Sequence, residues 1–313
     1  MRHILAAFLL TSVYQTASAQ SLLETFGSGA NQFTMEFVTI GNPGNAPDTT
    51  GSPIPAGSVA YTYNLGKYEV SRDMITKANA AGSLGITLQD MTNYGGNGVN
   101  KPATGVSWYE AAKYVNWLNT STGGTAAYKF DGSGNIQLWS AGDAGYNANN
   151  LFRNSLAKYV ITSTDEWYKG AYGSADGSWS NFPNGWDGSP TPVAGGTDEN
   201  TAVYGQSSDT GPADITNAGG LSAYGTMAQG GNVAEWNETA QDGSNNIADE
   251  NREVRGGRWN STNGNLSVFT RANLGLDPSS QNNGFVGFRV ASVPEPSTLS
   301  LLAVGLALIR RRK

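Results

Sequence analysis

The residues best suited to chemistry follow a pair of glycines, Gly230 and Gly231. Asn232 and Glu235 offer oxygen atoms three residues apart, and amide and carboxylate oxygens are the ligands that a hard cation such as Ca²⁺ prefers. The same stretch is equally consistent with a glycine turn that enters a buried strand, in which Glu235 pairs with an arginine. The residue types alone do not decide between an ion site and a buried turn.

Pairs of carboxylates offer a second kind of chemistry. Glu235 with Glu238, or Asp165 with Glu166, could supply an acid and a base for hydrolysis. Carboxylates so close together on one strand or turn are rarely placed on opposite sides of a substrate. A carboxylate-based hydrolase therefore stays an alternative and not the first expectation.

The chain has no cysteine and a single histidine, His3. The absence of cysteine excludes disulfides, zinc–thiolate sites and thiol nucleophiles. If His3 is removed with a leader peptide, the mature protein also lacks the Ser-His-Asp and Cys-His systems and the usual copper and zinc ligands. Any catalysis would depend on Asp, Glu, Lys, Tyr, Ser or Thr, and copper is not expected.

The N-terminal segment has the order of parts that is typical of a secretory signal. Arg2 precedes an apolar run over 4–10, and the small residues Ala17, Ser18 and Ala19 follow. An N-terminal helix of the fold is the alternative, but the run is short and its flanks fit export. We therefore predict a signal peptide over 1–19 and cleavage by signal peptidase after Ala19.

The C-terminal segment combines Pro294, Glu295 and Pro296 with an apolar run over 299–309 and a basic cluster at 310–313. The run is shorter than the about 20 residues of a stable membrane span, and the basic cluster would stay in the cytoplasm. Together the three parts resemble the PEP-CTERM sorting signal of Gram-negative bacteria. The resemblance implies transient anchoring in the inner membrane, cleavage by an exosortase near the Pro-Glu-Pro motif, and release to the cell surface or an exopolysaccharide matrix.

One domain is expected between these ends, over 20–292, with 293–313 as the sorting segment. The two ends contain five of the 19 basic residues and one of the 25 acidic residues, so the domain is more acidic than the whole chain, whose net charge is −6. Such a surface repels nucleic acid and anionic lipid. Glycine, at 41 of 313 residues, is well above its usual share of about 7%. With eight Trp, 14 Tyr and 10 Phe, the composition predicts a loop-rich globule with an aromatic core.

Three helices are predicted from their start signals. They begin at the N-cap Ser71, at the capping box Ser107–Glu110 and at the capping box Ser163–Glu166. Gly82 and Gly173 are expected to end the first and the third. Strands are predicted over 31–40 and 59–64, where apolar residues alternate.

The stretch 174–220 is dominated by Gly, Pro, Asp, Asn, Ser and Thr. A loop this long in a compact domain is usually functional or held in place by something. Asn200 and Asp209 could help an ion to hold it. A solvated polar loop is the alternative, and the residue types favour neither.

Six motifs then follow one another in an order that resembles the formylglycine-generating enzyme/sulfatase-modifying factor family. They are Lys67–Ser71, Pro102–Ala112, Thr164–Trp167, Gly231–Trp236 (similar to G-N-V-W-E-W), Arg255–Trp259 (similar to R-G-G-S-W) and Gly287–Arg289 (similar to G-F-R). The resemblance implies an α+β fold, the C-type-lectin-like variant of that family, loop-rich with few short strands and about three helices. It also implies bound calcium, with Asn232 and Glu235 as ligands of one ion and Asn200 and Asp209 as approximate candidates for another.

The chain departs from the family at its catalytic centre. Catalytic members hold a copper ion with two cysteines just after R-G-G-S-W, and Ser261 and Leu266 stand about where those thiols would be. Neither side chain binds cuprous copper as a thiolate does. We therefore predict that the protein does not make formylglycine, and we name no catalytic residue.

The expected function is that of an exported, non-catalytic binding domain. A lectin-like fold, two export signals and the missing thiols favour a glycan or another surface component, such as a protein, as its ligand. Trp179, Trp186 and Trp259 lie in or beside predicted loops, and the CH groups of sugars stack on such rings. A formylglycine-generating-type oxidoreductase and a carboxylate-based hydrolase acting outside the cell are the alternatives.

Overall fold

The computed structural model describes residues 21–271, 276–280 and 285–294 of the 313-residue chain. The predicted processing residues Ala19, Glu295 and Pro296 lie outside these ranges. Pro294 is the last described residue, and it is exposed. None of the helices in the described ranges has both the length and the apolar character to cross a membrane.

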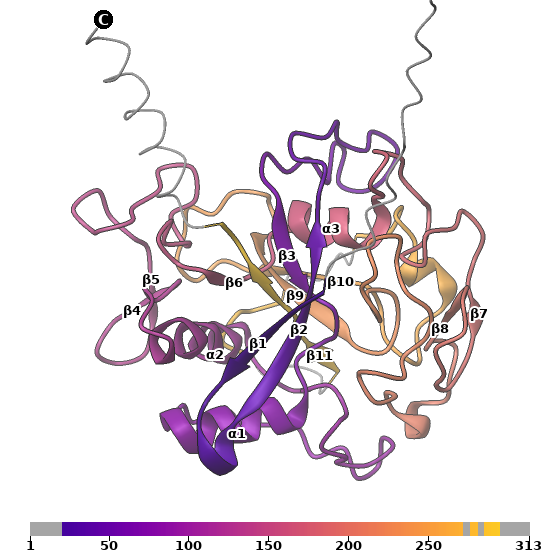
Figure 1. Ribbon diagram of the computed structural model, residues 1–313, viewed down its shortest axis with the longest axis horizontal. Coiled ribbons are helices and arrows are strands. Elements are labelled where there is room, and N and C mark those ends of the chain that lie inside the picture. The colour runs from indigo at the N-terminus through magenta and orange to yellow at the C-terminus, as the bar shows by residue number, and fades with distance from the viewer. Residues whose placement is uncertain (1–20, 272–275, 281–284, 295–313) are drawn as a thin grey trace, which may run out of the picture.

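A five-stranded antiparallel sheet forms one centre of the fold, with the strand order β1-β2-β3-β12-β6 (Figure 1). Its strands are β1 (Ser21–Phe26), β2 (Phe33–Ile40), β3 (Tyr63–Gly66), β12 (Val290–Ser292) and β6 (Tyr159–Ile161). β12 lies between β3 and β6, so the last described strand closes a sheet begun by the first. The predicted strand over 31–40 is present from Phe33, whereas the one over 59–64 forms only from Tyr63.

A second, three-stranded sheet contains the candidate residues Glu235 and Glu238. β9 (Ala234–Ala240) lies between β10 (Arg252–Arg255), which is antiparallel to it, and β11 (Val286–Gly287), which is parallel to it. Short two-stranded pairs complete the strands: β4 (Lys129–Phe130) with β5 (Ile136–Gln137), and β7 (Thr191–Pro192) with β8 (Thr201–Ala202). The 3-10 turns are η1 (Gly29–Asn31), η2 (Ser208–Thr210) and η3 (Asn263–Leu266).

The three predicted helices are α1 (Arg72–Gly82), α2 (Trp108–Ser121) and α3 (Thr164–Tyr172). Their predicted caps are present. The Ser71 side chain accepts a hydrogen bond from the backbone N–H of Met74, and both capping boxes are complete. Each cap satisfies a backbone donor that the first turn of a helix leaves unpaired.

Gly82 does not end α1 in the predicted way. It is the last helical residue, and Ser83 after it takes the left-handed conformation, with φ 52°. Close packing gives a different reason for glycine at position 82, since a Cβ atom there would lie 2.5 Å from Cδ1 of Trp117. The glycine thus allows α1 to approach α2.

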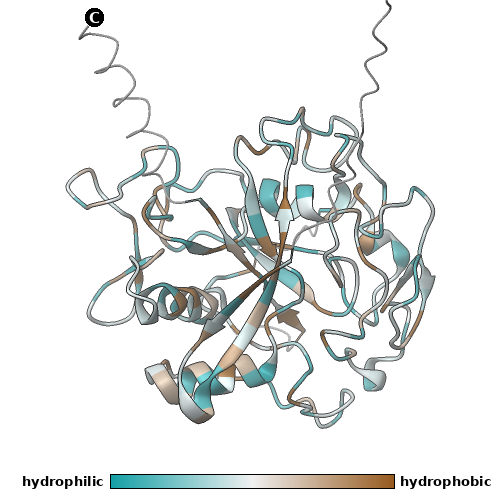
Figure 2. Cartoon of the chain, in the orientation of Figure 1, coloured by the Kyte–Doolittle hydropathy of each residue, from teal (hydrophilic) through white to brown (hydrophobic). Residues whose placement is uncertain are grey.

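Aromatic side chains fill the interior, as the composition predicted. Trp108, Trp167, Trp236 and Trp259 are among the largest fully buried side chains. The Trp236 ring N–H donates to the Val106 carbonyl, and the Trp108 ring N–H donates to the Asn237 carbonyl, so the start of α2 is joined to β9. In Figure 2 hydrophobic residues concentrate along the central strands, while the outer loops are mostly hydrophilic or neutral.

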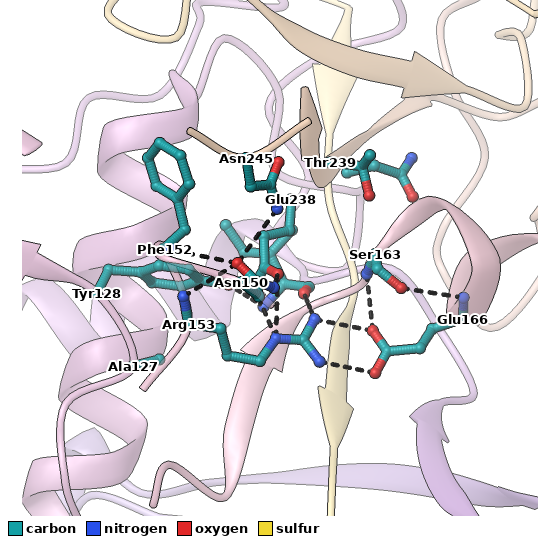
Figure 3. A network of polar contacts seen from close by, with 12 residues as sticks. Ala127, Tyr128, Asn150, Phe152, Arg153, Ser163, Glu166, Glu238, Thr239 and Asn245 are labelled. Carbon is teal, nitrogen blue, oxygen red and sulfur yellow. Dashed lines mark hydrogen bonds and ion pairs between the residues drawn. The ribbon is translucent and has the colours of Figure 1, made fainter. Parts of the chain in front are cut away.

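A buried ionic network joins the loop after α2 to β9 and α3. Arg153 lies between two carboxylates, its Nη1 and Nη2 donating to Glu166 at 2.8 and 2.9 Å and its Nε donating to Glu238 at 2.9 Å (Figure 3). Although burial opposes ionisation, the Arg153 guanidinium holds the pKa of Glu166 below its usual value. Tyr128 also donates to Glu238, at 2.7 Å. The network therefore fixes an irregular segment that has little secondary structure of its own.

Candidate functional site

Glu235 is held by an arginine inside the protein. Arg289 donates to its two carboxylate oxygens at 2.6 and 2.8 Å, and the ring N–H of Trp167 donates to it at 2.6 Å. All three side chains are fully buried. The interpretation in which Glu235 enters a buried strand and pairs with an arginine therefore describes this structure.

Asn232 occupies the turn before β9 in the left-handed conformation, with φ 56°. Its amide group donates to Glu69 at 2.6 Å, and its Oδ1 accepts from the backbone N–H of Ala213 at 2.8 Å. The Ala213 contact attaches the long 174–220 loop to the start of β9. Hydrogen bonding thus supplies a restraint for which an ion was one candidate.

In the two predicted calcium pairs, Asn232 with Glu235 and Asn200 with Asp209, the side-chain oxygens face protein partners or lie on the surface. The oxygens of Glu235 already face a guanidinium, and Oδ1 of Asn232 accepts a backbone N–H. Asn200 accepts a hydrogen bond from Asn184 at 2.6 Å, and Asp209 lies on the exposed turn η2. Within the described ranges no group of three or more His, Cys, Asp or Glu residues is arranged to hold a metal ion. The residues do not fit calcium in this arrangement, and calcium stays a prediction from the resemblance alone.

Glu69 shares this buried cluster. Burial, together with the nearby charge of Glu235, raises the pKa of Glu69 well above its usual value, and Arg289 only partly opposes the rise. A raised folded-state pKa means that the stability from this group is full below the unfolded pKa of 4.5 and falls as pH rises through the folded pKa.

We therefore expect the variant Glu69→Gln to lose less stability than the wild type between pH 5 and pH 8, by about 1 kcal/mol or more, because a pKa unit corresponds to about 1.4 kcal/mol. Urea unfolding at the two pH values measures the difference. Glu36→Gln, which removes a partly exposed partner of Lys67, serves as control and should follow the wild type. An equal loss of stability between the two pH values in Glu69→Gln and the wild type would contradict a raised pKa of Glu69.

Trp179 and Trp186 line one surface hollow of about 360 Å³, which we call the tryptophan hollow. Trp186 is 50% exposed. Trp179 is partly buried and packs edge-on against Tyr168, with ring centroids 5.5 Å apart. Asp187 and the hydroxyl residues Ser174, Ser178 and Ser180 line the same hollow. Two predicted ligand-contact rings are thus neighbours, with hydrogen-bonding groups beside them.

Two short turns after α3 place the rings. The first is closed by Asp176, which accepts from the backbone N–H and the hydroxyl of Ser178 at 2.9 and 2.8 Å and also from Ser174. These hydrogen bonds lower the pKa of Asp176 to about 2. The second turn is closed by a hydrogen bond from the Phe182 N–H to the Trp186 carbonyl, at 3.0 Å. Local hydrogen bonds therefore preorganise the tryptophan hollow.

Trp259 was wrongly predicted to contact a ligand. It is 0% exposed, its ring meets Phe285 edge-on at 4.7 Å, and its ring N–H donates to the Ser208 carbonyl at 3.1 Å. Its backbone is paired on both sides, with Asn232 and with Gln206, so the ring is directed into the interior. Trp259 therefore fills the core.

Ser261 and Leu266 stand in different surroundings. Ser261 lines a second hollow, of about 370 Å³, and its hydroxyl accepts from the backbone N–H of Arg258 at 3.0 Å. Leu266 is fully buried in a cluster with Ala202 and Tyr204. Neither Ser261 nor Leu266 offers a thiolate, and Leu266 lies in the core. Arg258 also lines this hollow, and no sequence pattern predicted it there. It occupies the position of the serine in the motif R-G-G-S-W.

Comparisons with solved structures show the fold. Treponema denticola variable protein 1 is 19% identical, with a TM-score of 0.57 over 88% of this chain and 100% of that one. The protein CarF is 18% identical, with a TM-score of 0.56 over 83% and 98%. PvdO from Pseudomonas aeruginosa is 19% identical, with a TM-score of 0.54 over 87% and 98%. No match was found among curated proteins.

Comparisons with protein families show both the domain and the sorting signal. The sulfatase-modifying factor enzyme 1-like domain matches residues 37–293, and the PEP-CTERM protein-sorting motif matches residues 292–313. The sorting motif indicates export, processing by an exosortase, and a location at the cell surface or outside the cell. The predicted loop-rich α+β fold with three helices is confirmed. The chain therefore belongs to the sulfatase-modifying factor enzyme 1-like family and ends in a PEP-CTERM sorting signal.

Proposed function

We propose that the domain is a non-catalytic carbohydrate-binding module that works outside the cell. The observation that supports it most is the meeting of Trp179 and Trp186 in one preorganised hollow of about 360 Å³. Glycans of the cell surface or the extracellular matrix are the ligands that an exosortase-processed protein would encounter there.

The chemistry of the tryptophan hollow suits a sugar. Ring faces attract the CH groups of a pyranose, and the indole of Trp186, half exposed, has a free surface for such stacking. Hydroxyl groups of Ser174 and Ser178 and the carboxylate of Asp187 can exchange hydrogen bonds with sugar hydroxyls. The volume lies within the range of about 300–1,000 Å³ that is usual for small-ligand pockets.

The carboxylates considered for a hydrolase are poorly placed for one. Glu235 and Glu238 are both fully buried, and each is held by an arginine, Arg289 and Arg153 respectively. Neither carboxylate lines the tryptophan hollow or the hollow beside Ser261. The burial of these carboxylates favours a binding role over a hydrolase. Ser261 and Leu266, in place of thiols, favour a binding role over an oxidoreductase.

A glycan array with the mature, exported form of the protein tests the proposal. The wild type and the variant Phe269→Ala are expected to bind the same glycans, because Phe269 is an exposed aromatic residue outside the tryptophan hollow. The variant Trp186→Ala is expected to lose that binding. An array without hits for correctly folded wild type would favour a surface protein as the partner and would contradict the carbohydrate assignment.

A further inference from the structure

The hollow beside Ser261, which we call the Arg258 hollow, has a chemistry different from that of the tryptophan hollow. Val254, Leu276 and Val286 are among the apolar residues that line it. Arg258, Asn260 and Thr262 are among the polar residues that line it. The volume of about 370 Å³ is enough for a small organic ligand.

Within the part of the chain that the structure describes, Arg258 differs from the buried arginines in having no carboxylate partner. Arg153, Arg255 and Arg289 each form an ion pair at 3.0 Å or less, whereas Arg258 forms none with the Asp and Glu side chains of the described ranges. The two internal stretches outside these ranges, 272–275 and 281–284, contain no Asp or Glu in their sequences. Partial burial without such a partner lowers the pKa of Arg258.

The position of the guanidinium is set by local contacts. It lies over the Phe285 ring, 4.8 Å from the ring centroid, and this stacking limits its rotation. The backbone of Arg258 forms a closed turn with Ser261, whose hydroxyl accepts the Arg258 N–H and whose own N–H donates to the Arg258 carbonyl at 2.9 Å. A charged group that is held in place and has no carboxylate partner among the described residues is suited to binding an anion.

Asn260 lies beside Arg258 in the lining of the same hollow. Its amide nitrogen donates to the Ser208 hydroxyl at 2.9 Å, and its buried Oδ1 has no hydrogen-bond partner among the described residues. Thr262 and Ser261 add hydroxyl groups to this side of the lining, so the neighbourhood of the guanidinium can exchange hydrogen bonds with ligand hydroxyls.

We propose that the Arg258 hollow binds the carboxylate of a small hydroxylated acid of the sugar-acid class, such as a hexuronate. The planar edge of the guanidinium would donate hydrogen bonds to the carboxylate, and the hydroxyl of Thr262 would exchange a hydrogen bond with a hydroxyl of the ring. A single arginine in an acidic chain matches the one charge of a carboxylate better than the higher charge of a phosphate. This inference rests on the Arg258 hollow alone and does not depend on the tryptophan hollow.

Isothermal titration of the folded protein with glucuronate, glucose and inorganic phosphate tests the proposal. The wild type is expected to bind glucuronate in preference to the other two, and Arg258→Gln is expected to weaken glucuronate binding at least about tenfold, because a charge-assisted hydrogen bond is lost. Arg258→Lys, which keeps the charge but not the planar fork, should fall between the two.

Two further measurements keep the result interpretable. Trp186→Ala should bind glucuronate as the wild type does, so that failure of the tryptophan hollow and failure of the Arg258 hollow are distinguishable. Thermal unfolding should show that Arg258→Gln is folded. Absence of glucuronate binding by the wild type, equal binding by Arg258→Gln, or binding of phosphate without preference for glucuronate would each overturn the proposal.

Discussion

Replacing Arg153 with methionine is expected to lower the free energy of unfolding by about 3–5 kcal/mol, because the change leaves buried carboxylates without their cation. Arg153 is bonded to both Glu166 and Glu238, whose side chains are 1% and 0% exposed. Methionine keeps an unbranched, apolar stem in place of the aliphatic part of arginine, so the main loss is that of charge pairing. Urea unfolding at pH 7 measures the effect.

The matched control is Lys77→Met, which breaks the partly exposed pair with Asp73 on α1. The two residues are four positions apart on the helix surface. Loss of their ion pair should change the free energy of unfolding by less than about 0.5 kcal/mol. Adding Glu166→Gln and Glu238→Gln to Arg153→Met should recover part of the loss, because the uncompensated charges are removed. A loss in Arg153→Met no larger than in the Lys77 control would contradict the buried network.

Replacing Arg289 with methionine is expected to have an effect of similar size, again about 3–5 kcal/mol. Arg289 pairs with Glu235 and also donates to the carbonyls of Gly66 and Met227, at 2.7 and 2.8 Å. The variant would leave the Glu235 carboxylate buried without its cation, beside Glu69, and would break the connection between β9 and the end of β3.

A double-mutant cycle isolates the ionic part of this effect. The double variant Arg289→Met/Glu235→Gln should be more stable than Arg289→Met alone, because no unpaired charge remains. Urea unfolding of the wild type, the two single variants and the double variant gives the coupling free energy. Additive losses would show that the pair contributes no coupling, and they would argue against Glu235 as a structural partner of Arg289.

The helix starts could be predicted because they depend on local hydrogen bonds. Ser107 with Glu110, and Ser163 with Glu166, lie three residues apart, and this spacing alone is enough to form a capping box. Short strands offer no comparable signal. β11 has two residues and pairs in parallel with β9, and β12 completes a sheet with β3, more than 200 residues earlier in the sequence. Such pairings are set by tertiary packing and not by alternation.

The candidate site was predictable only in part. Trp179 and Trp186 lie where the loop composition placed them, and the structure adds that they share a hollow. Trp259 looked equivalent in sequence, yet the pairing of its backbone directs it into the core. The one available signal for Arg258 was its departure from serine in R-G-G-S-W, and its unpaired state depends on which carboxylates come near it, which sequence spacing does not show.

The central claim is that the tryptophan hollow binds a glycan. Isothermal titration with the glycan selected on the array, comparing the wild type, Phe269→Ala and Trp186→Ala, tests it most directly. We expect equal affinity for the wild type and Phe269→Ala, and a loss of at least about tenfold for Trp186→Ala, because a stacked indole is often among the few residues that dominate binding. Wild-type affinity in folded Trp186→Ala would contradict glycan binding in the tryptophan hollow.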